Sequence, residues 1–77
     1  MDVSRVFELL DGRPFIPFAV DLENGKRIQV THPENVTIFP DRLRVKEILI
    51  WYPERDGYSI IWPRGISALH VGEAREA

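Results

Sequence analysis

The sequence predicts a mainly β fold, in which one short N-terminal helix is followed by about five bent antiparallel strands that form a small barrel. Three observations predict it. The chain of 77 residues is too short for a second core, so we expect a single domain over residues 1–77. Helical periodicity is confined to residues 3–10, and short alternating runs bounded by turn residues follow it. Closing such a sheet into a barrel would remove its exposed strand edges.

The N-terminal helix is expected over residues 3–10. Asp2 is placed to cap its start and Gly12 to end it. A helix this short is unstable alone in water, so it must dock on the strands. The apolar stripe that would dock is spaced at i, i+3, i+4 and i+7 and consists of Val3, Val6, Phe7 and Leu10.

The strongest local signal is the Asn-Gly pair at 24–25, which predicts a hairpin of strands 15–23 and 26–32. The alternating apolar residues of the two strands must share one face. A two-residue loop would set Val20 opposite Gln29 and would mix core with solvent. The requirement for one apolar face therefore excludes a two-residue loop.

A three-residue loop at 23–25 sets Val20 opposite Ile28 and keeps the apolar residues together. This loop is a type I turn followed by a bulge, and it requires a positive φ at Gly25. The same register predicts two further pairs, Phe18 with Val30 and Asp21 with Arg27.

The second strand should end at His32-Pro33, because a residue before proline is held extended and proline has no N–H to donate. The turn sequence PERDG, residues 53–57, joins the expected strands over 42–52 and 58–63. The remaining strands are expected over residues 35–39, 42–52 and 58–63, with a helical turn at 66–69 and a short strand at 70–73.

The stretch RPFIPFAVDLENGKRIQVTHPE, residues 13–34, resembles a group of small uncharacterised bacterial proteins that share RPF-x-PF, an Asn/Asp-Gly-Lys/Arg turn and V-x-HPE. The resemblance covers under a third of the chain and implies no particular activity. The element order is similar to that of Sm-like barrels, in which a helix precedes five bent strands and which form rings and bind RNA. The Sm nucleotide-binding motifs are not recognisable here, so this resemblance implies the shape alone.

Composition excludes several classes of site. The chain has no cysteine, so it has no disulfide, no thiolate zinc site and no thiol nucleophile. Its formal charge of −2 gives no electrostatic footprint for duplex nucleic acid or an anionic membrane. No apolar run approaches the ~20 residues that a membrane span needs, and the N-terminus does not read as a secretory signal. We expect a cytoplasmic protein without membrane partners.

His32, Glu34 and His70 have the side-chain types of a two-His-one-carboxylate metal site, and a metal-dependent enzyme is one alternative. Turn chemistry explains His-Pro-Glu at a strand end without a metal, so we expect no metal and no cofactor. The chain also lacks a Gly-x-Ser-x-Gly turn and a phosphate-binding glycine loop. A small barrel is filled by its own side chains, so we do not expect an enzyme.

Arg42, Arg44 and Lys46 alternate with apolar residues and would put three cations on one face of the expected 42–52 strand. With an exposed aromatic nearby, such a face could follow a single-stranded RNA backbone. A solvated strand face that discourages edge-to-edge aggregation explains the same pattern. Because the chain is acidic overall, RNA binding is the alternative rather than the main prediction.

The hairpin over 48–62 is hydrophobic on both faces, in ILIWY and IIW. One face enters the core, and the other must meet either the helix and tail or another chain. Clustered aromatics are typical of interfaces. We therefore expect a non-enzymatic interaction module that forms a homo-oligomer or binds a protein partner. The predicted interface residues are Ile48, Ile50, Trp51, Tyr52, Tyr58 and Trp62.

Overall fold

The computed structural model describes residues 3–54 and 56–72 of the chain. A mainly β fold is confirmed, with one short helix, α1 (Ser4–Leu10). Two 3-10 turns, η1 (Pro33–Asn35) and η2 (Pro63–Gly65), connect strands. The six strands are β1 (Phe18–Leu22), β2 (Arg27–Val30), β3 (Val36–Phe39), β4 (Glu47–Trp51), β5 (Tyr58–Ile61) and β6 (Ile66–Val71).

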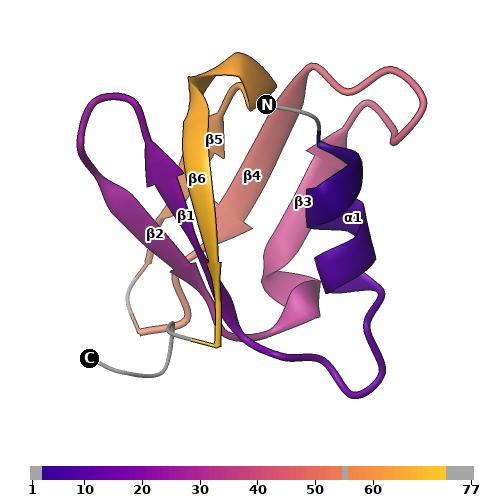
Figure 1. Cartoon of the computed structure of the whole chain (residues 1–77). Helices are drawn as coiled ribbons and strands as arrows, with labels where there is room; N and C mark the ends of the chain where they lie inside the picture. Colours follow the sequence, from indigo (N-terminus) through magenta and orange to yellow (C-terminus); the bar gives the residue numbers. More distant parts are fainter. Residues whose placement is uncertain (1–2, 55, 73–77) are drawn as a thin grey trace.

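The strands form two three-stranded antiparallel sheets, in the orders β2-β1-β6 and β3-β4-β5. The sheets face each other, and the chain crosses between them through η1 and η2 (Figure 1). In the part of the chain that the structure describes, no strand ladder joins the two sheets, so no closed barrel is found. The helix α1 lies beside β3, at one open side of this arrangement (Figure 1).

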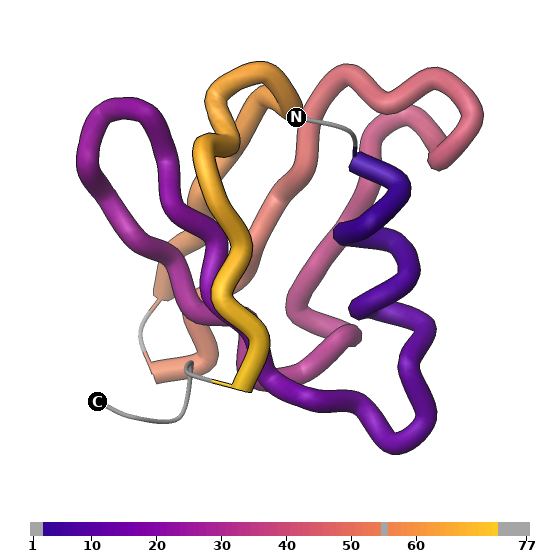
Figure 2. The backbone as a smooth tube through the Cα atoms, viewed as in Figure 1, coloured from indigo at the N-terminus to yellow at the C-terminus, as the bar shows by residue number. Residues whose placement is uncertain are grey.

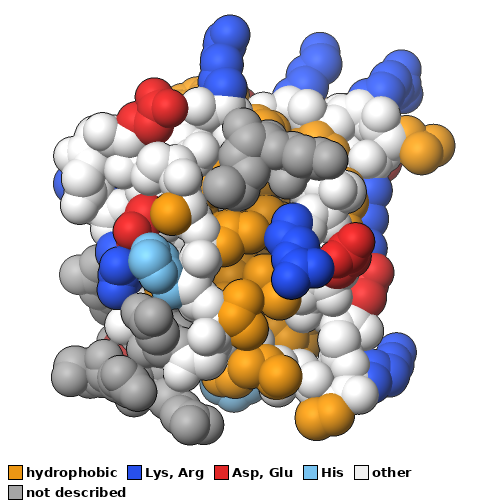
Figure 3. All heavy atoms as spheres, viewed as in Figure 1, with side chains coloured by type: hydrophobic (Ala, Val, Ile, Leu, Met, Phe, Trp, Pro, Cys, Tyr) orange, Lys and Arg blue, Asp and Glu red, His pale blue; other side chains and the backbone are white. Residues whose placement is uncertain are grey.

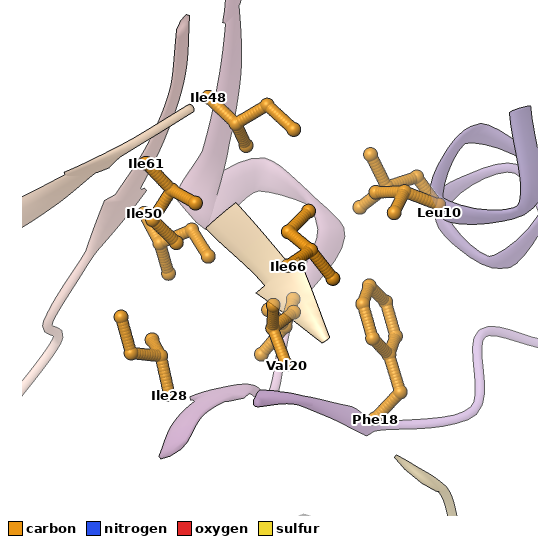
Figure 4. Close-up of a cluster of buried hydrophobic side chains, with 10 residues drawn as sticks. Leu10, Phe18, Val20, Ile28, Ile48, Ile50, Ile61 and Ile66 are labelled. Carbon is orange, nitrogen blue, oxygen red and sulfur yellow. The ribbon is translucent and has the colours of Figure 1, made fainter. Parts of the chain in front are cut away.

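The hydrophobic core lies between the two sheets. Figure 4 shows side chains from both sheets and from α1 pointing toward one another. Phe18 is the largest fully buried side chain, and the helix contributes Val6 and Leu10. The expected docking of the short helix is therefore confirmed. Val3 stands at the N-cap position and makes no side-chain capping hydrogen bond, while the expected cap Asp2 lies outside the described residues.

The register predicted for the first hairpin is confirmed. The Cα partners are Val20 with Ile28, and Gly25 has a φ of +90°. The Leu22 N–H donates to the Lys26 carbonyl oxygen at 2.8 Å, which closes the three-residue loop. Figure 2 shows this loop extending beyond the body of the first sheet. The other predicted pairs are also present, Phe18 with Val30 and Asp21 with Arg27.

The strand expected over 42–52 is shorter than predicted, because β4 begins at Glu47. The Asp41 carboxylate accepts the backbone N–H groups of Leu43 and Arg44, both at 2.9 Å. These bonds stabilise a turn at the point where alternation alone indicated a strand.

The helical turn predicted at 66–69 is wrong, because β6 already begins at Ile66 and runs to Val71. The 3-10 turn lies earlier, at Pro63–Gly65, where proline occupies a first-turn position that needs no donor. β6 pairs with the edge of β1 along its length. This long-range pairing overrides the weak local signal, and Glu73 of the expected 70–73 strand lies outside the described residues.

Candidate interaction surface

The outer face of the β3-β4-β5 sheet is mostly apolar, with Thr37 and Glu47 as its polar strand residues, although the inner face of the same sheet already forms part of the core. Leu49 lies opposite Ile60, and Trp51 lies opposite Tyr58. An antiparallel sheet with one face in the core usually carries polar residues on the other. We call this surface the aromatic face, and it consists of Phe39, Leu49, Trp51, Tyr58, Ile60 and Trp62.

Apart from the half-buried Leu49, the side chains of the aromatic face are about half exposed, from 43% for Trp51 to 55% for Phe39. The rings of Trp51 and Tyr58 stack, with centroids 6.5 Å apart and planes inclined by 20°. Five such side chains at about 200 Å² each expose roughly 500 Å² together. A patch of this size is at the upper end of what a monomeric protein exposes and is often functional.

The helix does not cover this surface. α1 lies at the open side next to β3 and turns Val6 and Leu10 toward the core (Figure 1). β6 belongs to the opposite sheet. The sequence left open whether the helix and tail, or another chain, would cover this face. The helix and the described part of the tail leave the aromatic face exposed.

Two of the predicted interface residues are wrong. Ile48 and Ile50 are 2% and 1% exposed and lie in the core, so they cannot contact another chain. Tyr52 is half-buried, and its hydroxyl hydrogen-bonds the Ser59 hydroxyl. Trp51, Tyr58 and Trp62 are exposed as expected. The members of the face that the sequence did not indicate are Phe39, Leu49 and Ile60. Strand alternation from Trp51 and Tyr58 would have indicated Leu49 and Ile60, whereas Phe39 is placed by the pairing of β3 with β4.

The three predicted cations do not form a row on a strand. Arg42 donates to both carboxylate oxygens of Asp11, at 2.7 and 2.9 Å, and lies 4.9 Å from the centre of the Phe7 ring. The hydrogen bond from Arg42 lowers the pKa of Asp11 below its usual value. Arg44 lies in the Asp41 turn, and the Lys46 N–H donates to the Phe39 carbonyl. Arg42 thus holds the 40–46 loop on the helix, and Figure 3 shows Lys and Arg side chains projecting separately at that end of the molecule.

The outer face of the β2-β1-β6 sheet carries a charged cluster instead. Asp21 accepts hydrogen bonds from Arg27 at 2.7 and 3.2 Å, and its other close partner is His70 at 2.9 Å. Hydrogen bonds from Arg27 and then His70 lower the pKa of Asp21 to about 2. A His side chain lies beside acidic and basic side chains on this face in Figure 3. The cluster links three strands.

The metal site suggested by His32, Glu34 and His70 is not assembled. His32 lies next to Thr31, with 3.1 Å between its Nδ1 and the Thr31 hydroxyl, whereas His70 contacts Asp21. Among residues 3–54 and 56–72, no three His, Asp or Glu side chains are grouped so that they could hold a metal ion.

Comparisons with protein-family models, with curated proteins and with solved structures found no match. The helix in the described part of the chain is too short and too polar to cross a membrane.

Proposed function

We propose that the protein is a non-enzymatic interaction module that self-associates through the aromatic face. One observation carries the proposal. The outer face of the β3-β4-β5 sheet exposes large apolar side chains, and no described element covers it. Leaving such a face in water costs free energy that burial against a matching surface recovers.

The chemistry of the face favours a protein surface over a nucleic acid. A shallow hollow of about 200 Å³ beside the stacked Trp51 and Tyr58 rings is lined otherwise by Asn35, Thr37 and Leu49, all uncharged. Binding of a single strand requires cations along the backbone path as well as stacking rings. A second copy of this face would meet mainly apolar side chains, with Glu47, opposite Phe39, at its margin.

The area of the face predicts a weak complex. Two copies would bury roughly 1,000 Å² in total, which is at the low end for specific interfaces and typical of transient ones. A dissociation constant in the micromolar range is expected for such an interface. Self-association also adds buried apolar area to a domain whose own core is small.

Sedimentation equilibrium of the full chain from about 1 μM to 1 mM tests this proposal. The wild type should shift from monomer to dimer over that range. Trp51→Ser and Ile60→Ser should remain monomeric. Leu43→Ser is the matched control, because Leu43 is 94% exposed and lies in the 40–46 loop, and it should dimerise as the wild type does. A wild type that stays monomeric at 1 mM would overturn the proposal.

The alternative of an Sm-like barrel that binds single-stranded RNA has weaker support. It depends on Arg42, Arg44 and Lys46, and the guanidinium of Arg42 is bound to Asp11. Binding of an oligouridine at low salt, where phosphate contacts are strongest, separates the two functions. Micromolar binding that is lost in Arg44→Glu would favour the RNA function.

A further inference from the structure

The two sheets are open toward each other on a second side, opposite the helix. A groove of about 570 Å³ runs between the edge strands β2 and β5. The β1–β2 turn lies at one end of it, and the start of the β4–β5 connection lies at the other. Its lining includes Leu22, Lys26, Gln29, Glu54, Ile60 and Ile61.

The backbone of β5 is oriented toward this groove. The Tyr52 N–H donates to the Gly57 carbonyl at 2.9 Å, and bonded and non-bonded pairs alternate along an antiparallel ladder. Tyr58 and Ile60 are therefore at non-bonded positions relative to β4. Their N–H and C=O groups point away from β4 and toward the groove.

The backbone of β2 is oriented in the same way from the other side. The bond from the Leu22 N–H to the Lys26 carbonyl sets the alternation of the first hairpin. Gln29, opposite Ala19, is then at a non-bonded position, and its N–H and C=O groups point away from β1. Two strand edges thus face one groove, and β2 and β5 run in opposite directions along it (Figure 1).

We propose that this groove binds an extended peptide, which adds as a strand between β2 and β5. Strand addition uses backbone donors and acceptors of the kind that both edges present. Ile28 and Ile61, which are 8% and 3% exposed, form an apolar floor for alternate side chains of the peptide. This site uses the backbone edge of β5, whereas the proposed self-association uses the outer face of that sheet.

The charges at the two ends of the groove select the peptide and its direction. Lys26 follows the β1–β2 turn and Glu54 lies in the β4–β5 connection, and these two segments lie at opposite ends of the groove (Figure 1). Strand pairing antiparallel to β5 places the peptide N-terminus near Lys26. The preferred peptide therefore carries an acidic residue at its N-terminal end and a basic residue at its C-terminal end.

The test uses the full wild-type chain and the probe acetyl-Glu-Thr-Val-Thr-Val-Thr-Lys-amide. Binding is followed by amide NMR shifts and by hydrogen exchange. We expect saturable binding below about 1 mM, with slower exchange at the amides of Gln29 and Ile60. The same peptide N-methylated at alternate amides should bind at least about tenfold more weakly, because it lacks the donors for strand pairing.

Charge variants test the direction. Lys26→Glu should weaken binding of the probe and strengthen binding of the peptide in which the two charged ends are exchanged. Lys46→Glu replaces a cation outside the groove and should change neither affinity. Equal binding of the N-methylated probe, or no binding at 1 mM, would overturn the proposal. It would also be overturned if the amides of Gln29 and Ile60 became protected on raising the protein concentration alone, because a second copy would then fill the groove.

Discussion

Gly25→Ala tests the loop that sets the register of the first hairpin. Gly25 has a φ of +90°, and a Cβ built there would meet no atom within 4 Å. The substitution therefore adds backbone strain without a steric clash, and that strain costs roughly 1–2 kcal/mol for a residue other than glycine. In a domain of this size such a loss lowers the midpoint of thermal unfolding by about 4–16 °C.

Gly65→Ala is the matched control for this variant. Gly65 also has open space at its Cβ position, but its φ is not positive. Replacing it should leave stability unchanged or raise it by up to about 1 kcal/mol, because the unfolded chain loses freedom. Calorimetry and urea unfolding at one protein concentration measure both variants. Equal stability of Gly25→Ala and Gly65→Ala would refute the three-residue loop.

Three further predictions concern the core, the 40–46 loop and the charged cluster. Ile50→Ala should lower the free energy of unfolding by about 2–5 kcal/mol. Ile60→Ala, on the opposite face of the same hairpin, should lower it by under about 1 kcal/mol in the monomer. Similar losses for the two variants in urea unfolding would contradict the assignment of the two faces. Arg42→Ala should lower the free energy of unfolding by about 0.5–1 kcal/mol, because it removes the contact with the Phe7 ring of the helix. An unchanged urea midpoint would show that this contact does not hold the 40–46 loop. Asp21 has a folded-state pKa of about 2 against 3.8 in the unfolded chain, so its contribution is complete above pH 3.8 and is lost as the pH falls toward 2. Asp21→Asn should flatten the pH dependence of stability in that window, and an unchanged slope in acid titration would count against the cluster.

Local pattern predicted the parts of the fold that depend on neighbouring residues. The alternation around the 24–25 turn allows only one register that keeps core residues on one face, and the structure has that register. Of β6, only its end was predicted, as the short strand at 70–73; its start was missed, because its partner β1 lies far away in the sequence and nothing local marks Ile66 as a strand start. The number of strands and the absence of a closed ladder likewise depend on tertiary pairing.

The aromatic face could be predicted in part. A run that is apolar at every position, such as residues 48–52, indicates burial on both faces but does not say which alternate residues face the core. Ile50 was therefore grouped with Trp51, although the two side chains point to opposite sides of β4. Arg42 alternates like a strand residue, and only its distant partner Asp11 reveals the contact it makes.

The most direct test of self-association uses the two tryptophans, since both Trp51 and Trp62 belong to the aromatic face and are 43% and 54% exposed. Acrylamide quenching of their fluorescence should be measured from below 1 μM to about 1 mM protein, the range in which a weak dimer forms. The proposed function predicts strong quenching at low concentration, and weaker quenching with emission at shorter wavelength at high concentration. Quenching that stays strong and constant across the whole range would contradict it.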